Sequence, residues 1–197
     1  MIKVYAMPGP ARSRRVLWAL EELGAPYEVV RLKFPARDHH PEYLKINPAG
    51  AVPALEDGEL RLLESLAICD YVSRKFGGEL TVEPDEADHP RYMEMMFFGE
   101  STLAPPIFWA RRLARHAEIL KAEAREAFAT RLTVLERALG DGRPFLAAGR
   151  LTLADVSVGY VLTLSEVAGL DDLIPPRAAA YHARLKTRPA YQRAYAA

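Results

Sequence analysis

The stretch Asn47–Ser65, which reads NPAGAVPALEDGELRLLES, decides the fold of this chain. It contains a turn with proline and glycine, a short apolar run that reaches Val52-Pro53, the turn dipeptide Asp57-Gly58, a second short run and the acid–hydroxyl pair Glu64-Ser65. This order of strand, tight turn, strand and helix start brings backbone donors and a helix dipole together. We interpret the stretch as a site for a small peptide-like anion.

The segments within this stretch and just after it predict a hairpin followed by a helix. Val52–Glu56 and Leu60–Leu63 flank the Asp57-Gly58 turn and are expected to pair as antiparallel strands. In Ser65–Phe76 the apolar residues recur at helical spacing, and Gly77-Gly78 ends the pattern.

Upstream of the stretch, the pattern predicts a βαβ unit. Ile2–Met7 and Tyr27–Leu32 are rich in strand formers, and Arg12–Gly24 between them has helical spacing, so the two strands are expected to be parallel. We predict a polar loop over Phe34–His40 and a short helical piece over Pro41–Ile46. The order β-α-β-α-β-β-α over residues 1–78 predicts an α/β domain of thioredoxin-like fold.

Pro53 opens an antiparallel strand, which is where a thioredoxin-like fold keeps its cis-proline. The alternative is an ordinary trans proline at the start of an edge strand. A cis bond would turn the backbone N–H and C=O of Val52 outward, where a peptide can pair with them as an added strand.

The second half of the chain is predicted to be entirely helical. Residues 79–89 are acidic, contain Pro84 and lack periodicity, so we interpret them as a linker to a helical domain over residues 90–197. Helices are expected over Pro90–Arg112 with a break or kink at Ala104-Pro105-Pro106, over His116–Leu139, Thr152–Ala168 and Arg177–Thr187, and from Pro189 onward.

The clearest local signal in this half lies at Thr152. Thr152 and Asp155 match a capping box, with aspartate in place of the more common glutamate. Leu151 and Val156 have the spacing of a hydrophobic staple, so a helix is expected to begin here.

Composition excludes several classes of function. The 197 residues include 26 Lys and Arg against 26 Asp and Glu, so no basic field suggests nucleic acid. The single cysteine cannot form an internal disulfide, which suits a reducing compartment. The sequence shows neither a signal peptide nor a long uncharged apolar run, so we expect a soluble cytoplasmic protein without membrane contact.

The pair Glu64-Ser65 suggests how an amino-acid end would be held. The first N–H groups of a helix lack intrahelical partners, so the Ser65 N–H and hydroxyl can hold a carboxylate. Glu64 can receive the ammonium of the same ligand. The alternative is that Ser65 is only the N-cap of its helix.

Three stretches together resemble the cytosolic glutathione transferases. NPAGAVPALEDGELRLLESLAICDYV resembles their glutathione-site region, IKVYAMPGPARSRRVLWALEELGAPYEVV resembles their first strand and helix, and FLAAGRLTLADV resembles the capped helix of their second domain. The likeness covers nearly the whole chain and is greatest to the phi class and its bacterial relatives. It implies a thioredoxin-like N-terminal domain, cis-Pro53, an all-helical C-terminal domain and a homodimer.

The resemblance implies glutathione contacts at six positions, which are His39, Ala51, Val52, Pro53, Glu64 and Ser65. Glu64 and Ser65 match the pair that holds the γ-glutamyl end, and the Val52 backbone matches the partner of the cysteinyl moiety. Ala51 stands where the family often has a polar or basic side chain. His39 falls near the residue that meets the glycine carboxylate, with a solvated loop histidine as the alternative.

The position that activates the sulfur departs from the family pattern. The thiolate is the nucleophile, and the family places Ser, Cys or Tyr beside it, but Pro10 and Ala11 stand at those positions here. Ser13 and Arg12 are the candidate catalytic substitutes, with an N-cap and a solvated arginine as their alternatives. The dipole of the first helix can also contribute. Tyr5 is one residue out of register with tyrosine-type relatives, so we interpret it as structural.

The remaining candidate residues are apolar. Cys69 is on the apolar face of its helix and is interpreted as a core thiol. No Cys/His set has metal-ligand spacing, so no metal is predicted. A pocket for the second substrate between the domains is assigned to Met7, Met96, Phe97, Phe108 and Trp109, with core packing or a dimer contact as the alternative.

The resemblance implies two candidate functions. The first is a glutathione transferase of detoxification type, which conjugates glutathione to a small apolar electrophile or reduces an organic peroxide with it. The second is a binding or interaction protein of the same fold with little turnover, which Pro10 and Ala11 favour.

Overall fold

The structure, a computed structural model, describes residues 1–33, 35–113 and 118–196, apart from the side chains at positions 37 and 111–121. It divides into two compact units. Unit 1 contains Met1–Thr81 and Arg188–Ala197, and unit 2 contains Val82–Thr187. The sequence predicted domains over residues 1–78 and 90–197 with a linker between them; by its internal contacts the last helix groups with unit 1.

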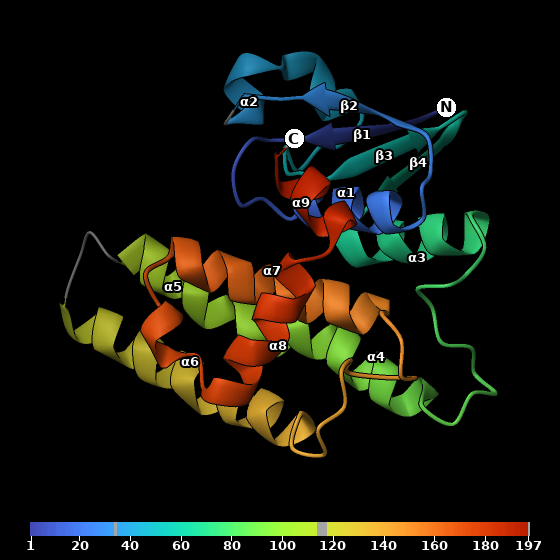
Figure 1. Ribbon diagram of the computed structural model, residues 1–197. Coiled ribbons are helices and arrows are strands. Elements are labelled where there is room, and N and C mark those ends of the chain that lie inside the picture. The colour runs from blue at the N-terminus through green and yellow to red at the C-terminus, as the bar shows by residue number, and fades with distance from the viewer. Residues whose placement is uncertain (34, 114–117, 197) are drawn as a thin grey trace. The chain divides into compact units, whose positions relative to one another are not determined.

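Unit 1 is built on a four-stranded mixed sheet in the order β2-β1-β3-β4 (Figure 1). Its strands are β1 (Ile2–Ala6), β2 (Tyr27–Arg31), β3 (Ala54–Asp57) and β4 (Leu60–Leu63). β1 is parallel to β2 and antiparallel to β3, which pairs antiparallel with β4. The predicted βαβ unit and hairpin are therefore confirmed, although β3 begins two residues later than expected.

Helices cover both faces of this sheet. α1 (Ser13–Glu22) and α3 (Ser65–Lys75) lie on one face, and α2 (Ala36–His39) lies on the other, as Figure 1 shows. The 3-10 helix η1 (Pro41–Lys45) follows α2. The prediction of a loop over Phe34–His40 is wrong for residues 36–39, because Ala36 is buried in an apolar cluster and its C=O accepts the His40 N–H. Phe34 itself is outside the described residues.

The last helix, α9 (Pro189–Ala196), packs on α1 within unit 1. The Trp18 and Tyr191 rings meet edge to face with their centroids 5.0 Å apart. Arg188 donates from Nε and Nη2 to the two carboxylate oxygens of Glu22, at 2.6 and 2.7 Å. A bidentate arginine–carboxylate pair beside a buried aromatic contact fixes α9 in one orientation on α1.

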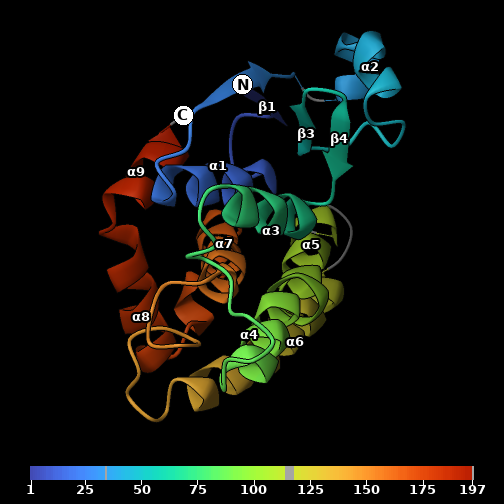
Figure 2. The same ribbon diagram turned by 90° about the vertical axis from the view of Figure 1, so that its right-hand side faces the viewer.

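Unit 2 is entirely helical over the residues that the structure describes. Its elements are α4 (His89–Phe97), the π-helix η2 (Phe98–Leu103), α5 (Ala104–Leu113), α6 (Glu118–Ala138), α7 (Leu153–Val167), η3 (Asp171–Leu173) and α8 (Pro176–Lys186). α7 is buried throughout Leu153–Leu162. Figure 2 shows it between α8 on one side and α4, α5 and α6 on the other. The predicted start of α6 at His116 is outside the described residues.

The expected break at Ala104-Pro105-Pro106 lies instead in the π-helix that precedes it. Both prolines lie in the first turn of α5, which follows the π-helix η2 without an interruption. In η2, a Cβ added at Gly99 would lie 2.3 Å from Ser157 Oγ. Ser157 Oγ donates to the Met96 C=O at 2.7 Å, so a glycine is needed where α7 approaches this closely.

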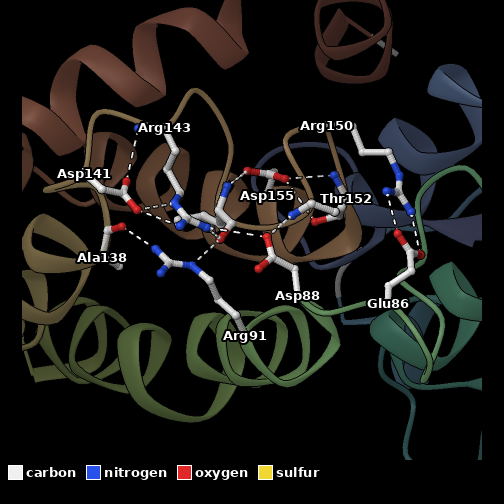
Figure 3. Close-up of polar contacts among 11 residues, drawn as sticks. Glu86, Asp88, Arg91, Ala138, Asp141, Arg143, Arg150, Thr152 and Asp155 are labelled. Atoms are coloured by element: carbon white, nitrogen blue, oxygen red, sulfur yellow. Dashed lines mark hydrogen bonds and ion pairs between the residues drawn. The ribbon is translucent and has the colours of Figure 1, made fainter.

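The capping box at the start of α7 is confirmed and extends beyond its helix (Figure 3). Asp155 Oδ2 accepts the Thr152 N–H at 2.8 Å and its hydroxyl at 3.1 Å. Asp155 Oδ1 accepts the Leu146 N–H at 2.9 Å and the Tyr181 hydroxyl at 2.8 Å. Burial raises the pKa of Asp155 to about 6, and these donors act in the opposite direction.

The loop before α7 is also fastened to the start of α4, as Figure 3 shows. Arg91 Nε donates to the Leu146 C=O at 2.6 Å, and Asp88 Oδ2 accepts the Ala148 N–H at 2.7 Å. Arg150 and Glu86 form two hydrogen bonds of 2.9 Å each. The residues expected to be a linker therefore hold the loop that carries the capping box.

We predict that Asp155→Ala lowers the free energy of unfolding by about 3 kcal/mol or more, because several buried donors lose their shared acceptor. Chemical denaturation measures the loss. Asp141→Ala, which removes an exposed partner of Arg143, is the matched control and is expected to change stability by less than about 0.5 kcal/mol. Equal losses in the two variants would contradict the structural role of Asp155.

Candidate functional site

The N-terminus of α3 is the centre of the candidate site. Glu64 is the N-cap residue, with φ of 67° and ψ of 113°, and Ser65 is the first helical residue. The alternative interpretation, in which Ser65 is the N-cap, is therefore wrong. The positive φ of Glu64 ends the strand conformation there, so that Glu64 is the N-cap and Ser65 is already helical. The first turn of α3 contains no acidic residue. A non-glycine residue in the left-handed region is uncommon and tends to mark functional positions.

The sheet register brings the loop before β3 next to this helix end. Ala54 pairs with Leu63 in the β3–β4 ladder, so Pro53 and Glu64 are the next residues beyond that pair. The Val52–Pro53 peptide bond is cis, as the sequence resemblance implied. The structure thus brings together five of the predicted positions, which are Ala51, Val52, Pro53, Glu64 and Ser65.

Two side chains hold the loop in front of Val52. The Tyr43 hydroxyl donates to the Ala51 C=O at 2.6 Å, and Asn47 Nδ2 donates to the same oxygen at 2.8 Å. Asn47 Oδ1 also accepts the Ala49 N–H at 3.0 Å, which closes a turn of the kind that asparagine favours. The two donors on the Ala51 C=O therefore hold the backbone of Ala51 and Val52 in place, whereas the Ala51 side chain is exposed.

A buried arginine supports Ser65 from the neighbouring helix. Arg15 in α1 has an exposed fraction of 0%, and its Nη1 donates to Ser65 Oγ at 3.3 Å. Ser65 is itself buried. The hydroxyl that we expect to bind the ligand carboxylate therefore also contacts a buried cation.

The start of α1 carries the residues considered for sulfur activation. Arg12 is the N-cap and is partly buried, and no acidic residue lies in the first turn. Ser13 is fully buried, and its Oγ has no hydrogen-bond partner among the described residues. Arg14 Nε donates to the Gly9 C=O at 3.0 Å and Nη1 donates to the Ala194 C=O at 2.6 Å, so α9 and the loop before α1 share one guanidinium.

Tyr5 and Cys69 have structural surroundings. The Tyr5 hydroxyl donates to Glu56 Oε2 at 2.7 Å, and its ring lies 5.2 Å from that of Tyr43. Burial and the Glu56 carboxylate raise the pKa of Tyr5 to about 12. Burial also raises the pKa of the Cys69 thiol to about 12, so it stays protonated at neutral pH.

The other predicted residues differ in their exposure and surroundings. His39 is exposed at the end of α2. Met7 is partly buried and packs against the cluster of Leu32, Ala36, Tyr43 and Ala54. In unit 2, Met96 is buried, Phe108 is partly buried, and Phe97 and Trp109 are 51% and 50% exposed. A cavity of about 480 Å³ in unit 2 includes none of these side chains and is lined by Ala129, Thr133, Glu136, Arg137, Gly140, Leu173, Pro175 and Arg177.

Sequence reasoning missed four residues that shape the site. Asn47 carried a usable signal, because an asparagine before proline favours a turn. Arg15 shares a helix face with the buried Trp18 and Ala19, and a charge on an apolar face could have indicated a buried role. Tyr43 and Arg14 act through contacts distant in sequence and had no local signal.

Two absences hold for the residues that the structure describes. No helix among them is both long and apolar enough to span a membrane. No group of three or more His, Cys, Asp or Glu side chains within the same residues is placed to hold a metal ion.

Comparison with known families gives two matches along the chain. The model for the glutathione S-transferase N-terminal domain matches residues 1–74. The model for the glutathione S-transferase C-terminal domain matches residues 118–184. Together the two matches cover more than half of the chain.

Individual relatives agree with this result. The chain is 29% identical to glutathione S-transferase 1 of Triticum aestivum, over 98% of this chain and 92% of that protein. It is 46% identical to glutathione S-transferase 1 of Zea mays in an alignment that spans only 42% of this chain and 39% of that protein. A glutathione transferase family member of Pseudomonas fluorescens, solved with two glutathione molecules bound, has a TM-score of 0.85 and 27% identity, over 98% of this chain and 92% of that one.

We predict that Tyr5→Phe lowers the free energy of unfolding by about 1 kcal/mol, because one partly buried hydrogen bond is lost. The variant is expected to match the wild type on immobilised glutathione, since the Tyr5 hydroxyl donates its proton to Glu56. Denaturation and affinity chromatography measure the two quantities. Normal stability with lost retention would show that the phenol belongs to the site.

Proposed function

Because the chain belongs to the glutathione S-transferase family, we propose that it binds glutathione in unit 1 and transfers the glutathione sulfur to an apolar electrophile. The observation that carries this proposal is the open N-terminus of α3 beside the fixed Ala51–Pro53 backbone. A helix end offers N–H donors to a carboxylate, and a loop backbone that is held in place offers its N–H and C=O groups to a peptide.

Each part of glutathione has a matching group in unit 1. The γ-glutamyl carboxylate is assigned to the N–H and hydroxyl of Ser65, and its ammonium is assigned to the exposed Glu64. The cysteinyl backbone is assigned to Val52, before cis-Pro53. The glycine carboxylate is assigned to His39, which is exposed. Ala51 contributes only its backbone.

We assign thiolate stabilisation to the start of α1 and to Arg12. A free thiol has a pKa of about 8.5, and the positive end of a helix or a nearby cation lowers it. The first turn of α1 contains no acidic residue that would oppose this effect. Ser13 is the less favoured donor, because its hydroxyl is fully buried.

The proposed reaction is a nucleophilic attack by the thiolate. The thiol proton passes to solvent, the thiolate attacks the electrophilic carbon and the S–C bond forms. With an aryl halide, the halide leaves with the electrons of its bond. For the electrophile we propose Met7 as the candidate contact in unit 1 and Met96, Phe97, Phe108 and Trp109 as the candidates in unit 2. Phe97 and Trp109 expose about half of their surface.

A binding protein with little turnover is the second candidate. The observation that favours it is Pro10-Ala11, since neither side chain can donate a hydrogen bond to sulfur. Under either function we propose a cytoplasmic homodimer. The exposed Leu60 and Leu63 on the edge strand β4 support a protein partner.

We predict that Ser65→Ala weakens glutathione binding by about tenfold to a hundredfold, because a hydrogen bond to a charged group is lost. Isothermal titration calorimetry measures the dissociation constant. Glu64→Gln is expected to weaken binding as well, whereas Glu59→Gln, an exposed glutamate of the hairpin turn, is the matched control. Wild-type protein that does not bind glutathione would exclude both candidate functions.

We predict that Arg12→Glu raises the pKa of the bound thiol by roughly one unit, because it places an anion at the positive end of α1. Thiolate absorbance against pH measures this value, and turnover with an aryl halide is measured alongside. Arg74→Glu makes the same charge change on an exposed part of α3 and is expected to have no effect. Ser13→Ala is expected to leave the thiol pKa unchanged.

Turnover separates the two candidate functions. Glutathione binding without turnover of any halide or peroxide would favour the binding protein over the transferase. If the thiol pKa rises in Ser13→Ala but not in Arg12→Glu, Ser13 and not Arg12 stabilises the thiolate.

A further inference from the structure

Arg15 is a cation enclosed within unit 1. It lies in α1 with no exposed surface, and its Nη1 donates to Ser65 Oγ of α3 at 3.3 Å. A guanidinium stays charged at any pH that a protein tolerates. Its hydrogen bond to Ser65 connects a buried charge to the first residue of α3, so Arg15 is a candidate for a role at this helix end.

We infer that Arg15 is a positioning residue for the γ-glutamyl carboxylate of glutathione and acts through Ser65. This inference rests on the proposed binding of glutathione in unit 1. It adds a residue that the sequence resemblance did not assign to the site.

The first step of the argument is the direction of the Ser65 hydroxyl. A serine hydroxyl has one proton and two lone pairs, and Arg15 has no acceptor. Because Ser65 Oγ accepts from Arg15, its own proton must point to another group. A ligand carboxylate bound at the start of α3 would accept this proton, so Arg15 sets Ser65 as a donor toward the ligand.

The second step is the field of the buried charge. An interaction between charges is several times stronger in a protein interior than in water. The charge of Arg15 also acts on the thiol of Cys69, one turn after Ser65. Burial raises the pKa of this thiol, and the positive charge of Arg15 acts in the opposite direction. A carboxylate held at Ser65 would be attracted by the same charge, and no acidic residue in the first turn of α3 competes with it.

A purely structural role is the competing explanation, because Arg15 also joins α1 to α3. The two explanations differ in which ligand atoms matter. A positioning residue affects only ligands that carry the γ-glutamyl carboxylate, whereas a structural residue affects every ligand of the site equally.

The test compares two ligands by calorimetry. One is glutathione, and the other is the analogue in which hydrogen replaces the carboxylate of the γ-glutamyl α-carbon. Arg15→Met is expected to weaken glutathione binding by at least about tenfold and analogue binding by less than about twofold. If the wild type turns over an aryl halide, the KM of Arg15→Met for glutathione is expected to rise while its kcat stays unchanged. Arg61→Met, an exposed arginine of β4, is the matched control with no loss expected.

Non-additivity gives a second readout. Adding Ser65→Ala to Arg15→Met is expected to weaken binding less than the two single losses combined, since both remove one linked contact. If Arg15→Met does not fold, Arg15→Gln, which is neutral but polar, carries the same two-ligand comparison. Equal loss for both ligands, or no loss for glutathione, would overturn the inference while leaving the proposed function intact. Absence of glutathione binding by the wild type would overturn both.

Discussion

The shared acceptor at the Ala51 C=O is the contact on which the site of unit 1 depends. The Tyr43 hydroxyl and the Asn47 amide reach this oxygen together, from η1 and from the turn after it. Two donors on one carbonyl restrict the rotation of the peptide and fix the direction of the chain into Val52–Pro53. The register of β3 against β4 then places Glu64 beside this loop. The loop at Ala51–Pro53 and the start of α3 therefore lie side by side, with the loop held through the Ala51 C=O.

The start of α1 organises the other half of unit 1 through two neighbouring arginines with different tasks. Arg14 binds the carbonyls of Gly9 and Ala194, which connects the loop before α1 to α9. Arg15 lies one residue further and turns toward Ser65. Consecutive helical residues point about 100° apart, so two adjacent side chains can serve two different neighbours. Changing either arginine would alter a different contact of the same helix.

The sequence predicted the elements whose signals are local. The Asp57-Gly58 turn gave the hairpin, and Thr152 with Asp155 gave the start of α7, because turn and capping chemistry act within a few residues. Five of the site positions followed from the resemblance and lie together in unit 1.

The remaining features depend on residues that are distant in sequence. α2 forms where Ala36 joins an apolar cluster with Tyr43 and Ala54, which a window over residues 34–40 does not contain. The π-helix forms where α7 approaches Gly99 closely. The role of Arg15 is visible only once α1 and α3 pack together. Local sequence patterns carry no information on these contacts. The prediction was therefore least complete for elements and residues whose conformation depends on packing between distant segments.

The contact between α9 and α1 has a consequence for the order of synthesis. Unit 1 uses both ends of the chain, since Trp18 and Glu22 meet Tyr191 and Arg188. Domains generally fold as their residues emerge from the ribosome, beginning with the N-terminus. Here residues 1–81 emerge before unit 2, and residues 188–197, which supply the contacts of α9, emerge after it. Unit 1 is therefore assembled from segments that are translated before and after unit 2.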